Sequence, residues 1–142
     1  MFNPLSLISN LYKTNSLLSD SRLSEIIKDS EKRVAEYYNI PKDILKSKYT
    51  IENLPEIFIY GVRYVGGVLE GYIKKVGKIL GMYNPENDHI SIGYKNLYSE
   101  KRFRETVIHE LIHKVQKVLG KIYTLPRYLL EKEAYEVTEK LT

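Results

Sequence analysis

Three stretches of the chain repeat apolar residues at intervals of three and four, the spacing that is typical of amphipathic helices. The first covers residues 20–38, with Ser19 placed to cap its N-terminus. The second covers residues 100–119 and is followed by Gly120, a residue type that favours helix C-termini. The third begins after Pro126. In the first helix, the inward positions are expected to be Leu23, Ile26, Ile27, Val34 and Tyr37.

Other stretches carry strand and turn signals. Residues 56–60 form an apolar run between a proline and a glycine, which predicts a buried strand. Residues 78–83 and 89–94 flank the Asn-Pro-Glu-Asn-Asp turn signal of residues 84–88, which predicts an antiparallel hairpin. Residues 65–76 have apolar positions at a helical period, so we expect a helix there, although glycines in and beside it weaken the pattern. Those glycines are Gly66, Gly67, Gly71 and Gly77.

These elements together predict an α+β fold with a small, mostly antiparallel, twisted sheet covered by helices. We expect residues 55–142 to form the core, and residues 1–54 to form a helical segment packed on it, with a short helical turn at residues 42–47. The segment either supports the core or lies across a cleft as a cap or prosegment, and the sequence leaves both open. Residues 1–18 lack the charge and apolar run of a secretory signal, so we expect a cytoplasmic protein. A short amphipathic element is expected there from Leu5, Ile8, Leu11 and Tyr12.

The helix over residues 100–119 contains an H-E-x-x-H motif, His109-Glu110-Leu111-Ile112-His113. Residues four apart lie one turn apart on the same helix face, so both imidazoles can bind one metal ion. A zinc ion with three protein ligands keeps one position open for water, and Glu110 is placed to take a proton from that water. The apolar positions of this helix form one broad arc, which leaves the histidines on the side of a cleft. The alternative is a solvated helix face that happens to carry two histidines.

A third metal ligand is expected downstream of the motif. No histidine follows His113 and no aspartate follows Asp88, so the ligand must be a glutamate of the last helix. Glu133 lies three after Leu130 and four before Val137, beside the apolar stripe, and it is the predicted ligand. The full set of downstream glutamates is Glu131, Glu133, Glu136 and Glu139. The alternative is that Glu133 binds no metal and is an ordinary solvated charge paired with a neighbouring lysine.

The motif, followed twenty residues later by Glu133 within Glu-Lys-Glu-Ala, resembles the gluzincin metallopeptidases. The small size resembles the minigluzincins, and the Glu-x-Glu-Ala signature is also similar to the ImmA-like peptidases. The resemblance covers the chain from about residue 55 to its C-terminus. It implies a zincin-like fold, Zn²⁺ held by His109, His113 and Glu133, and Glu110 as general base and acid in peptide-bond hydrolysis.

The substrate of such a site would be a peptide or protein. Residues 89–93 alternate apolar and polar side chains just before the metal helix, and this strand resembles the edge strand along which zincins bind an extended peptide through main-chain hydrogen bonds. A donor for the developing oxyanion is also required. His89 is one candidate, although a solvated surface role is commoner for such a residue. The rival candidates are Tyr83, Tyr94, Tyr128 and Tyr135.

Composition limits the remaining possibilities. With 142 residues, 43% hydrophobic and 28% charged, the chain suits one ordinary domain without a membrane span. It has no cysteine, so disulfides and thiolate metal sites are excluded. The net charge of +4 permits acidic partners, and Lys114, Lys117 and Lys121 share a helix face, but a solvated face explains them better than nucleic acid. A regulatory protein that cleaves one partner and a non-catalytic interaction protein with a vestigial motif stay open.

Overall fold

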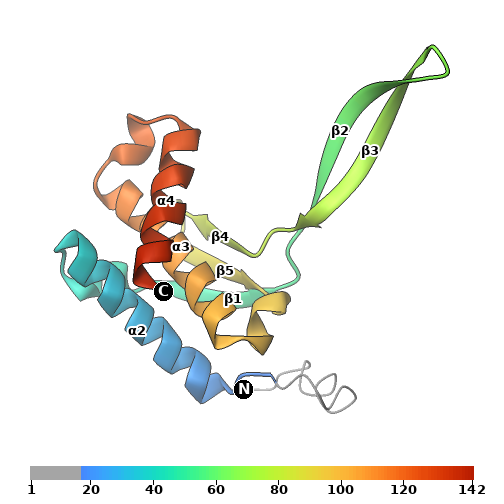
Figure 1. Ribbon diagram of the computed structural model, residues 1–142. Coiled ribbons are helices and arrows are strands. Elements are labelled where there is room, and N and C mark those ends of the chain that lie inside the picture. Colours follow the sequence, from blue (N-terminus) through green and yellow to red (C-terminus); the bar gives the residue numbers. More distant parts are fainter. Residues whose placement is uncertain (1–16) are drawn as a thin grey trace.

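The computed structural model describes residues 17–142, with side chains described for all of these except residues 57–63, 72 and 74–78. The amphipathic element expected from Leu5, Ile8, Leu11 and Tyr12 lies outside the described residues. Over the described range the fold is α+β, and its helices, its small sheet and a separate β-hairpin can be followed in Figure 1.

The three predicted helices are confirmed as α2 (Asp20–Tyr38), α3 (Glu100–Val118) and α4 (Arg127–Leu141). Ser19 caps α2 as expected, because its hydroxyl oxygen accepts the backbone N–H three residues on. Gly120 follows α3 with a φ of 75°, a left-handed conformation that suits glycine at a helix C-terminus. Among the described residues, no helix combines the length and the apolar character needed to cross a membrane.

The small sheet has the strand order β1-β5-β4. The predicted hairpin is confirmed, since β4 (Gly81–Asn84) pairs antiparallel with β5 (His89–Gly93). The other neighbour of β5 is β1 (Lys48–Glu52), which runs parallel to it, so the sheet is mixed. β1 carries little strand signal in the sequence, because its short Lys-Tyr-Thr-Ile-Glu run is only half-buried on one face. β1 follows a 3₁₀ turn at Lys42–Leu45, where a helical turn was expected.

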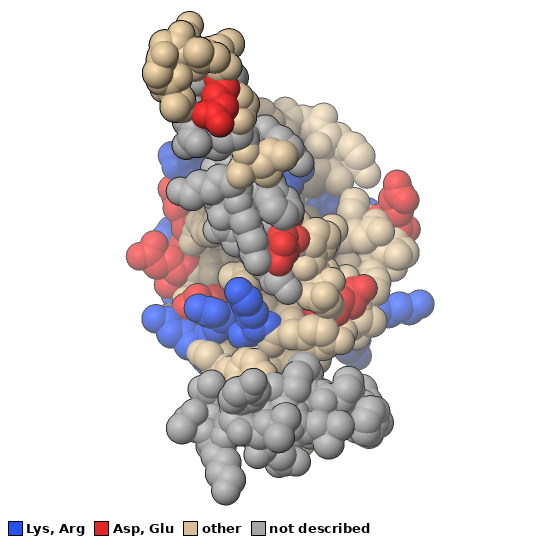
Figure 2. Space-filling view, turned by 90° about the vertical axis from the view of Figure 1, so that its right-hand side faces the viewer, with Lys and Arg blue, Asp and Glu red and all other residues tan. Residues whose placement is uncertain are grey.

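The prediction of a helix at residues 65–76 is wrong, because this stretch belongs to a long β-hairpin. β2 (Glu56–Val65) pairs antiparallel with β3 (Val68–Lys78) through a two-residue turn. Gly66 and Gly67 form this turn with φ values of 58° and 82°, and two successive positive φ angles are what a tight hairpin turn demands. Two of the four glycines that weakened the helical pattern were thus a turn signal, while Gly71 and Gly77 lie within β3. The hairpin projects from the rest of the fold (Figure 1), and mainly uncharged residues cover its tip in Figure 2.

One hydrophobic core joins the helices to the sheet. α3 lies at its centre and contacts α2, α4, β4 and β5. Side chains from α2 enter the same core as those of α3, and β1 pairs with β5, so the described part of the segment before residue 55 shares its core and sheet with the rest. Tyr37, expected to face inward, is instead 44% exposed. The largest fully buried side chains are Phe103, Ile26, Leu45, Ile90, Ile92, Leu97, Ile108, Leu111, Ile112, Gln116, Val34 and Val107.

The start of β4 lies directly against α3. Asn96, which is fully buried, donates its side-chain amide to the carbonyl of Leu80 at 2.8 Å and accepts the hydroxyl of Thr106 at 2.7 Å. These bonds bring the next residue, Gly81, so close to α3 that a Cβ there would lie 2.6 Å from Cγ2 of Thr106 and 3.2 Å from Cγ of Glu110. Only glycine permits this approach without displacement of the strand.

We therefore expect Gly81→Ala to destabilise the protein by about 1–3 kcal/mol, the usual cost of an overpacked contact, in urea unfolding. Thr106→Ser removes the obstructing methyl group and keeps the hydroxyl that bonds to Asn96, so the same change should cost less in that background. Gly71→Ala is the matched control, because no atom lies within 4 Å of a Cβ there. Equal costs for Gly81→Ala in both backgrounds would contradict the close approach.

Candidate metal centre

The two histidines of the motif project side by side from α3. Their rings form an edge-to-face pair with centroids 4.9 Å apart, as expected for residues one helical turn apart. The side chains of His109 and His113 are 16% and 18% exposed, so each is largely enclosed but reachable from one side. The opposite side of α3 is core, which holds the helix in a fixed orientation. The structure therefore places the two imidazoles as the sequence predicted.

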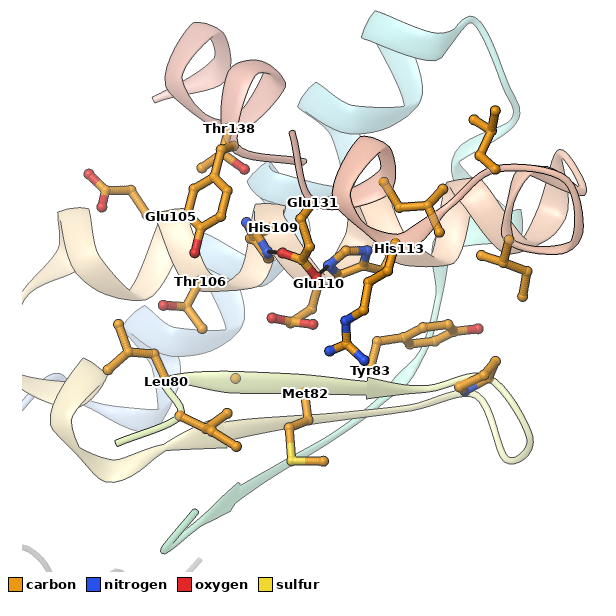
Figure 3. Close-up of a pocket in the computed structure, with 18 residues that line it drawn as sticks. Leu80, Met82, Tyr83, Glu105, Thr106, His109, Glu110, His113, Glu131 and Thr138 are labelled. Atoms are coloured by element: carbon orange, nitrogen blue, oxygen red, sulfur yellow. Dashed lines mark hydrogen bonds and ion pairs between the residues drawn. The ribbon is translucent and has the colours of Figure 1, made fainter. Parts of the chain in front are cut away.

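A carboxylate from α4 completes a three-residue cluster with these histidines, and it belongs to Glu131. One Glu131 oxygen lies 3.3 Å from Nε2 of His109, and the other lies 3.1 Å from Nε2 of His113. Candidate ligand atoms of the three residues all lie within 4.8 Å of one another. Figure 3 shows the Glu131 side chain reaching between the two rings.

The expected ligand Glu133 does not join this cluster. Its carboxylate points away and accepts hydrogen bonds from Lys121 at 2.7 Å, Gln116 at 2.9 Å and Tyr38 at 3.2 Å. Partial burial acts to raise the pKa of the Glu133 carboxyl, but the bonds from these donors outweigh burial and lower the pKa below its usual value. The structure thus gives Glu133 a different set of partners from the one that the sequence analysis expected.

The error has a simple geometric origin in the helix α4. Both glutamates border the buried stripe around Ala134, which is fully buried against the core, but they lie on opposite flanks of it. Thr138 is also buried, at 9% exposure, and lies on the same flank as Glu131. Counting this threonine as an inward position would have moved the centre of the stripe toward Glu131. The apolar residues alone placed the centre too close to Glu133.

The donor set suits zinc. Two imidazole nitrogens and one carboxylate are a common ligand set for a zinc ion that keeps one position open. Burial lowers the pKa of His109, and the nearby His113 lowers it further, while Glu131 acts in part to raise it. The net effect lowers the pKa and favours the neutral imidazole, which is the form that binds a metal. Nδ1–H of His113 donates to the side-chain oxygen of Gln116 at 2.8 Å, which leaves its Nε2 with a lone pair directed at the cluster.

Glu110 lies on the same cleft and is only 7% exposed. Burial raises the pKa of its carboxyl, the charge of Glu131 raises it further, and a hydrogen bond from the backbone N–H of Tyr83 partly opposes both, for a value of about 8. The carboxyl is therefore a group that can carry a proton close to neutral pH. Its position beside the cluster agrees with the role that the motif predicts.

These groups line a cleft of about 1000 Å³ between α3, α4 and β4. The strand beside the cleft is β4, and not β5 as the sequence analysis expected, because β5 is the middle strand and is paired on both sides. The backbone N–H of Gly93 bonds to the carbonyl of Leu80, and bonded and open positions alternate along such a pair. Gly81 and Tyr83 therefore turn their backbone groups toward the cleft. Figure 3 shows β4 running below the cluster.

Of the candidate oxyanion donors, only Tyr83 and Tyr135 line the described cleft. The Tyr83 hydroxyl is engaged with Asp88 at 3.1 Å. The Tyr135 ring contacts the His109 ring edge to face, with centroids 4.7 Å apart. His89 lies elsewhere, with Nε2 2.7 Å from the hydroxyl of Thr50, and Tyr94 and Tyr128 are not part of the cleft wall. Tyr135 is thus the candidate closest to the cluster.

The three lysines that share a face of α3 and its C-terminal end are each bound within the protein. Lys114 is 4% exposed and forms an ion pair with Asp88 at 2.8 Å. Lys117 donates to the carbonyl of Pro85, and Lys121 pairs with Glu133. Each of these three lysines therefore has an acceptor or an ion-pair partner within the protein.

Comparison with known proteins gave no match: no protein-family model, no curated protein and no solved structure is significantly similar to this chain.

Proposed function

We propose that this protein is a zinc-dependent peptidase that hydrolyses peptide bonds. The observation that carries the proposal is the convergence of His109, His113 and Glu131, with Nε2 to carboxylate distances of 3.1 and 3.3 Å, beside the buried Glu110 in an open cleft. Three donors of the type that zinc prefers and one adjacent proton carrier are the parts that hydrolysis by this chemistry requires.

Each residue has a distinct role in this proposal. His109, His113 and Glu131 would hold zinc, which when bound acidifies water and polarises a carbonyl group. The Glu110 carboxylate would accept a proton from the attacking water and return it to the nitrogen of the amine that leaves. The backbone N–H of Tyr83 holds that carboxylate in place, so the proton carrier faces the cleft. A zincin-like, gluzincin-type assignment of the site belongs to this same proposal.

The shape of the cleft favours a peptide substrate over a small amide. The open edge of β4 offers the backbone groups of Gly81 and the carbonyl of Tyr83, to which an extended peptide can add as a further strand without a particular sequence. Apolar side chains from β4 and the residue before it, from the segment before α4 and from α4 itself line the remaining walls, so uncharged side chains of a substrate would be favoured. These are Leu80, Met82, Ile122, Leu125 and Leu130.

The metal content of variants tests whether Glu131 or Glu133 is the third metal ligand. We expect about one zinc per chain in the purified protein, measured by elemental mass spectrometry, and loss of the metal in His113→Ala and Glu131→Ala, which each remove one of three ligands. Glu133→Ala should retain most of the zinc at saturating metal. Glu136→Ala is the matched control, because it removes an exposed glutamate from the same helix. Zinc lost in Glu133→Ala but kept in Glu131→Ala would overturn the ligand assignment.

Glu110→Gln should keep the zinc and lower peptide hydrolysis by about 10²-fold or more, because the ligands remain while the proton carrier is removed. The measurement is cleavage of a peptide library by equal amounts of zinc-loaded wild type and variant. Cleavage by the variant at the wild-type rate would rule out Glu110 as the proton carrier. If the zinc-loaded wild type cleaved neither the library peptides nor unfolded proteins, the proposal that the protein is a peptidase would be wrong.

Tyr135→Phe should lower kcat by about 10²-fold with little change in KM, if its hydroxyl stabilises the developing oxyanion. Tyr83→Phe is the matched control in the same cleft, because it removes a hydroxyl that bonds to Asp88 while the backbone N–H toward Glu110 remains. Equal effects of the two variants on kcat would assign Tyr135 a packing role against His109.

A further inference from the structure

We propose that Gln116 and Glu133 form a relay that sets the tautomer and orientation of His113, so that Glu133 acts as a positioning residue and not as a ligand. The inference rests on the proposed metal centre for its function, but the relay itself involves only residues of this chain. It begins at Nδ1 of His113, on the ring edge that faces away from Glu131.

The first step of the relay is the side chain of Gln116. Its oxygen lies 2.8 Å from Nδ1 of His113, and an amide oxygen only accepts, so Nδ1 must carry the proton. Its nitrogen donates to the backbone carbonyl of Leu130 at 2.8 Å and to a carboxylate oxygen of Glu133 at 2.9 Å. Both partners of the nitrogen are acceptors, so the amide cannot rotate by 180° without placing its own oxygen against them. Gln116 is fully buried, and water cannot replace these partners.

The second step is the anchoring of Glu133. Its other carboxylate oxygen accepts from the ammonium group of Lys121 at 2.7 Å and from the hydroxyl of Tyr38 at 3.2 Å. Three donors thus converge on one carboxylate, each from a different element: Gln116 from α3, Lys121 from the 3₁₀ turn Lys121–Tyr123, and Tyr38 from α2. Hydrogen bonds to an ionised group are stronger than neutral ones, so the charge of Glu133 holds the relay in one arrangement.

The relay has a defined consequence for the metal centre. A proton held on Nδ1 leaves the lone pair of His113 on Nε2, the atom that lies 3.1 Å from Glu131. Partners of this kind raise ligand basicity and fix the ring plane, and their loss usually weakens metal binding by about 10–100-fold. Through Tyr38, helix α2 is connected to the proposed ligand His113 by three hydrogen bonds in series. This gives the segment before residue 55 a supporting role at the centre.

The test is the tautomer of His113, read by long-range ¹H–¹⁵N correlation of the imidazole nitrogens in the metal-free protein, at a pH where the imidazoles are neutral. The chain has three histidines, and the resonances of His113 are those that disappear in His113→Ala. We expect the wild type to show the Nδ1–H form alone. Gln116→Met keeps the length of the side chain and removes its amide, so the variant should show both tautomers and bind zinc about 10–100-fold more weakly.

Glu133→Gln provides a second variant in case the first does not fold. The variant replaces the charged carboxylate, which accepts hydrogen bonds from Gln116, Lys121 and Tyr38, with a neutral amide. The Gln116 side chain still donates to the Leu130 carbonyl, so zinc binding should weaken by less than in Gln116→Met. Glu139→Gln, which removes an exposed charge from the same helix, should match the wild type in both readouts. Folding of every variant is checked by circular dichroism, because loss of the fold would also lose the metal.

Two results would overturn the relay: a wild-type His113 that carries its proton on Nε2, or a tautomer and a zinc affinity that do not change in folded Gln116→Met or Glu133→Gln. The failure of the proposed function is a different result. A wild type with the Nδ1–H form that takes up no zinc, or that takes it up and cleaves no peptide, would contradict the peptidase and leave the relay standing.

Discussion

The packing of α4 against α3 brings the three proposed metal ligands together. Ala134 is fully buried where the two helices meet, and its small side chain permits a close approach. The approach brings one flank of α4 over the histidines and the other flank over Gln116, so Glu131 and Glu133 reach α3 at different places. A larger residue at 134 would separate the helices and move both carboxylates. The cluster and the relay behind it thus depend on the same contact.

The edge strand β4 is held against α3 at both of its ends by polar groups, of which Asn96, Thr106 and Lys114 are buried. At one end, Asn96 links the carbonyl of Leu80 to the hydroxyl of Thr106 on α3. At the other end, the carboxylate of Asp88 accepts the Tyr83 hydroxyl at one oxygen and the Lys114 ammonium at the other. Lys114 also donates to two oxygen atoms of residues 46 and 47, so its buried charge is fully paired. These contacts tie both ends of the strand to the helix.

The β2–β3 hairpin is bound to the rest of the fold much less closely. A two-stranded hairpin has little stability of its own, because it has no second layer to pack against. At its tip the described apolar side chains are open to solvent, with Tyr64 77% exposed and Val68 67% exposed. Its second strand leads directly into the residues before β4, and Ile79 and Leu80 line the cleft. The cleft and the projecting hairpin are therefore adjacent along the chain.

By itself, the sequence determined the features that depend on neighbours along the chain. The spacing of apolar residues located all three described helices, the Asn-Pro-Glu-Asn-Asp signal located the β4–β5 turn, and the four-residue spacing brought His109 and His113 to one face. These are local consequences of backbone geometry. Tertiary structure decided the rest: which edge of the sheet faces the cleft, whether a glycine-rich run pairs as a hairpin, and which glutamate meets the histidines. Glu131 and Glu133 flank the same buried stripe of α4. The periodicity of a helix gives the direction in which a side chain points, but it does not identify the residue that the side chain contacts. Only the packing of α4 on α3 therefore distinguishes the two glutamates.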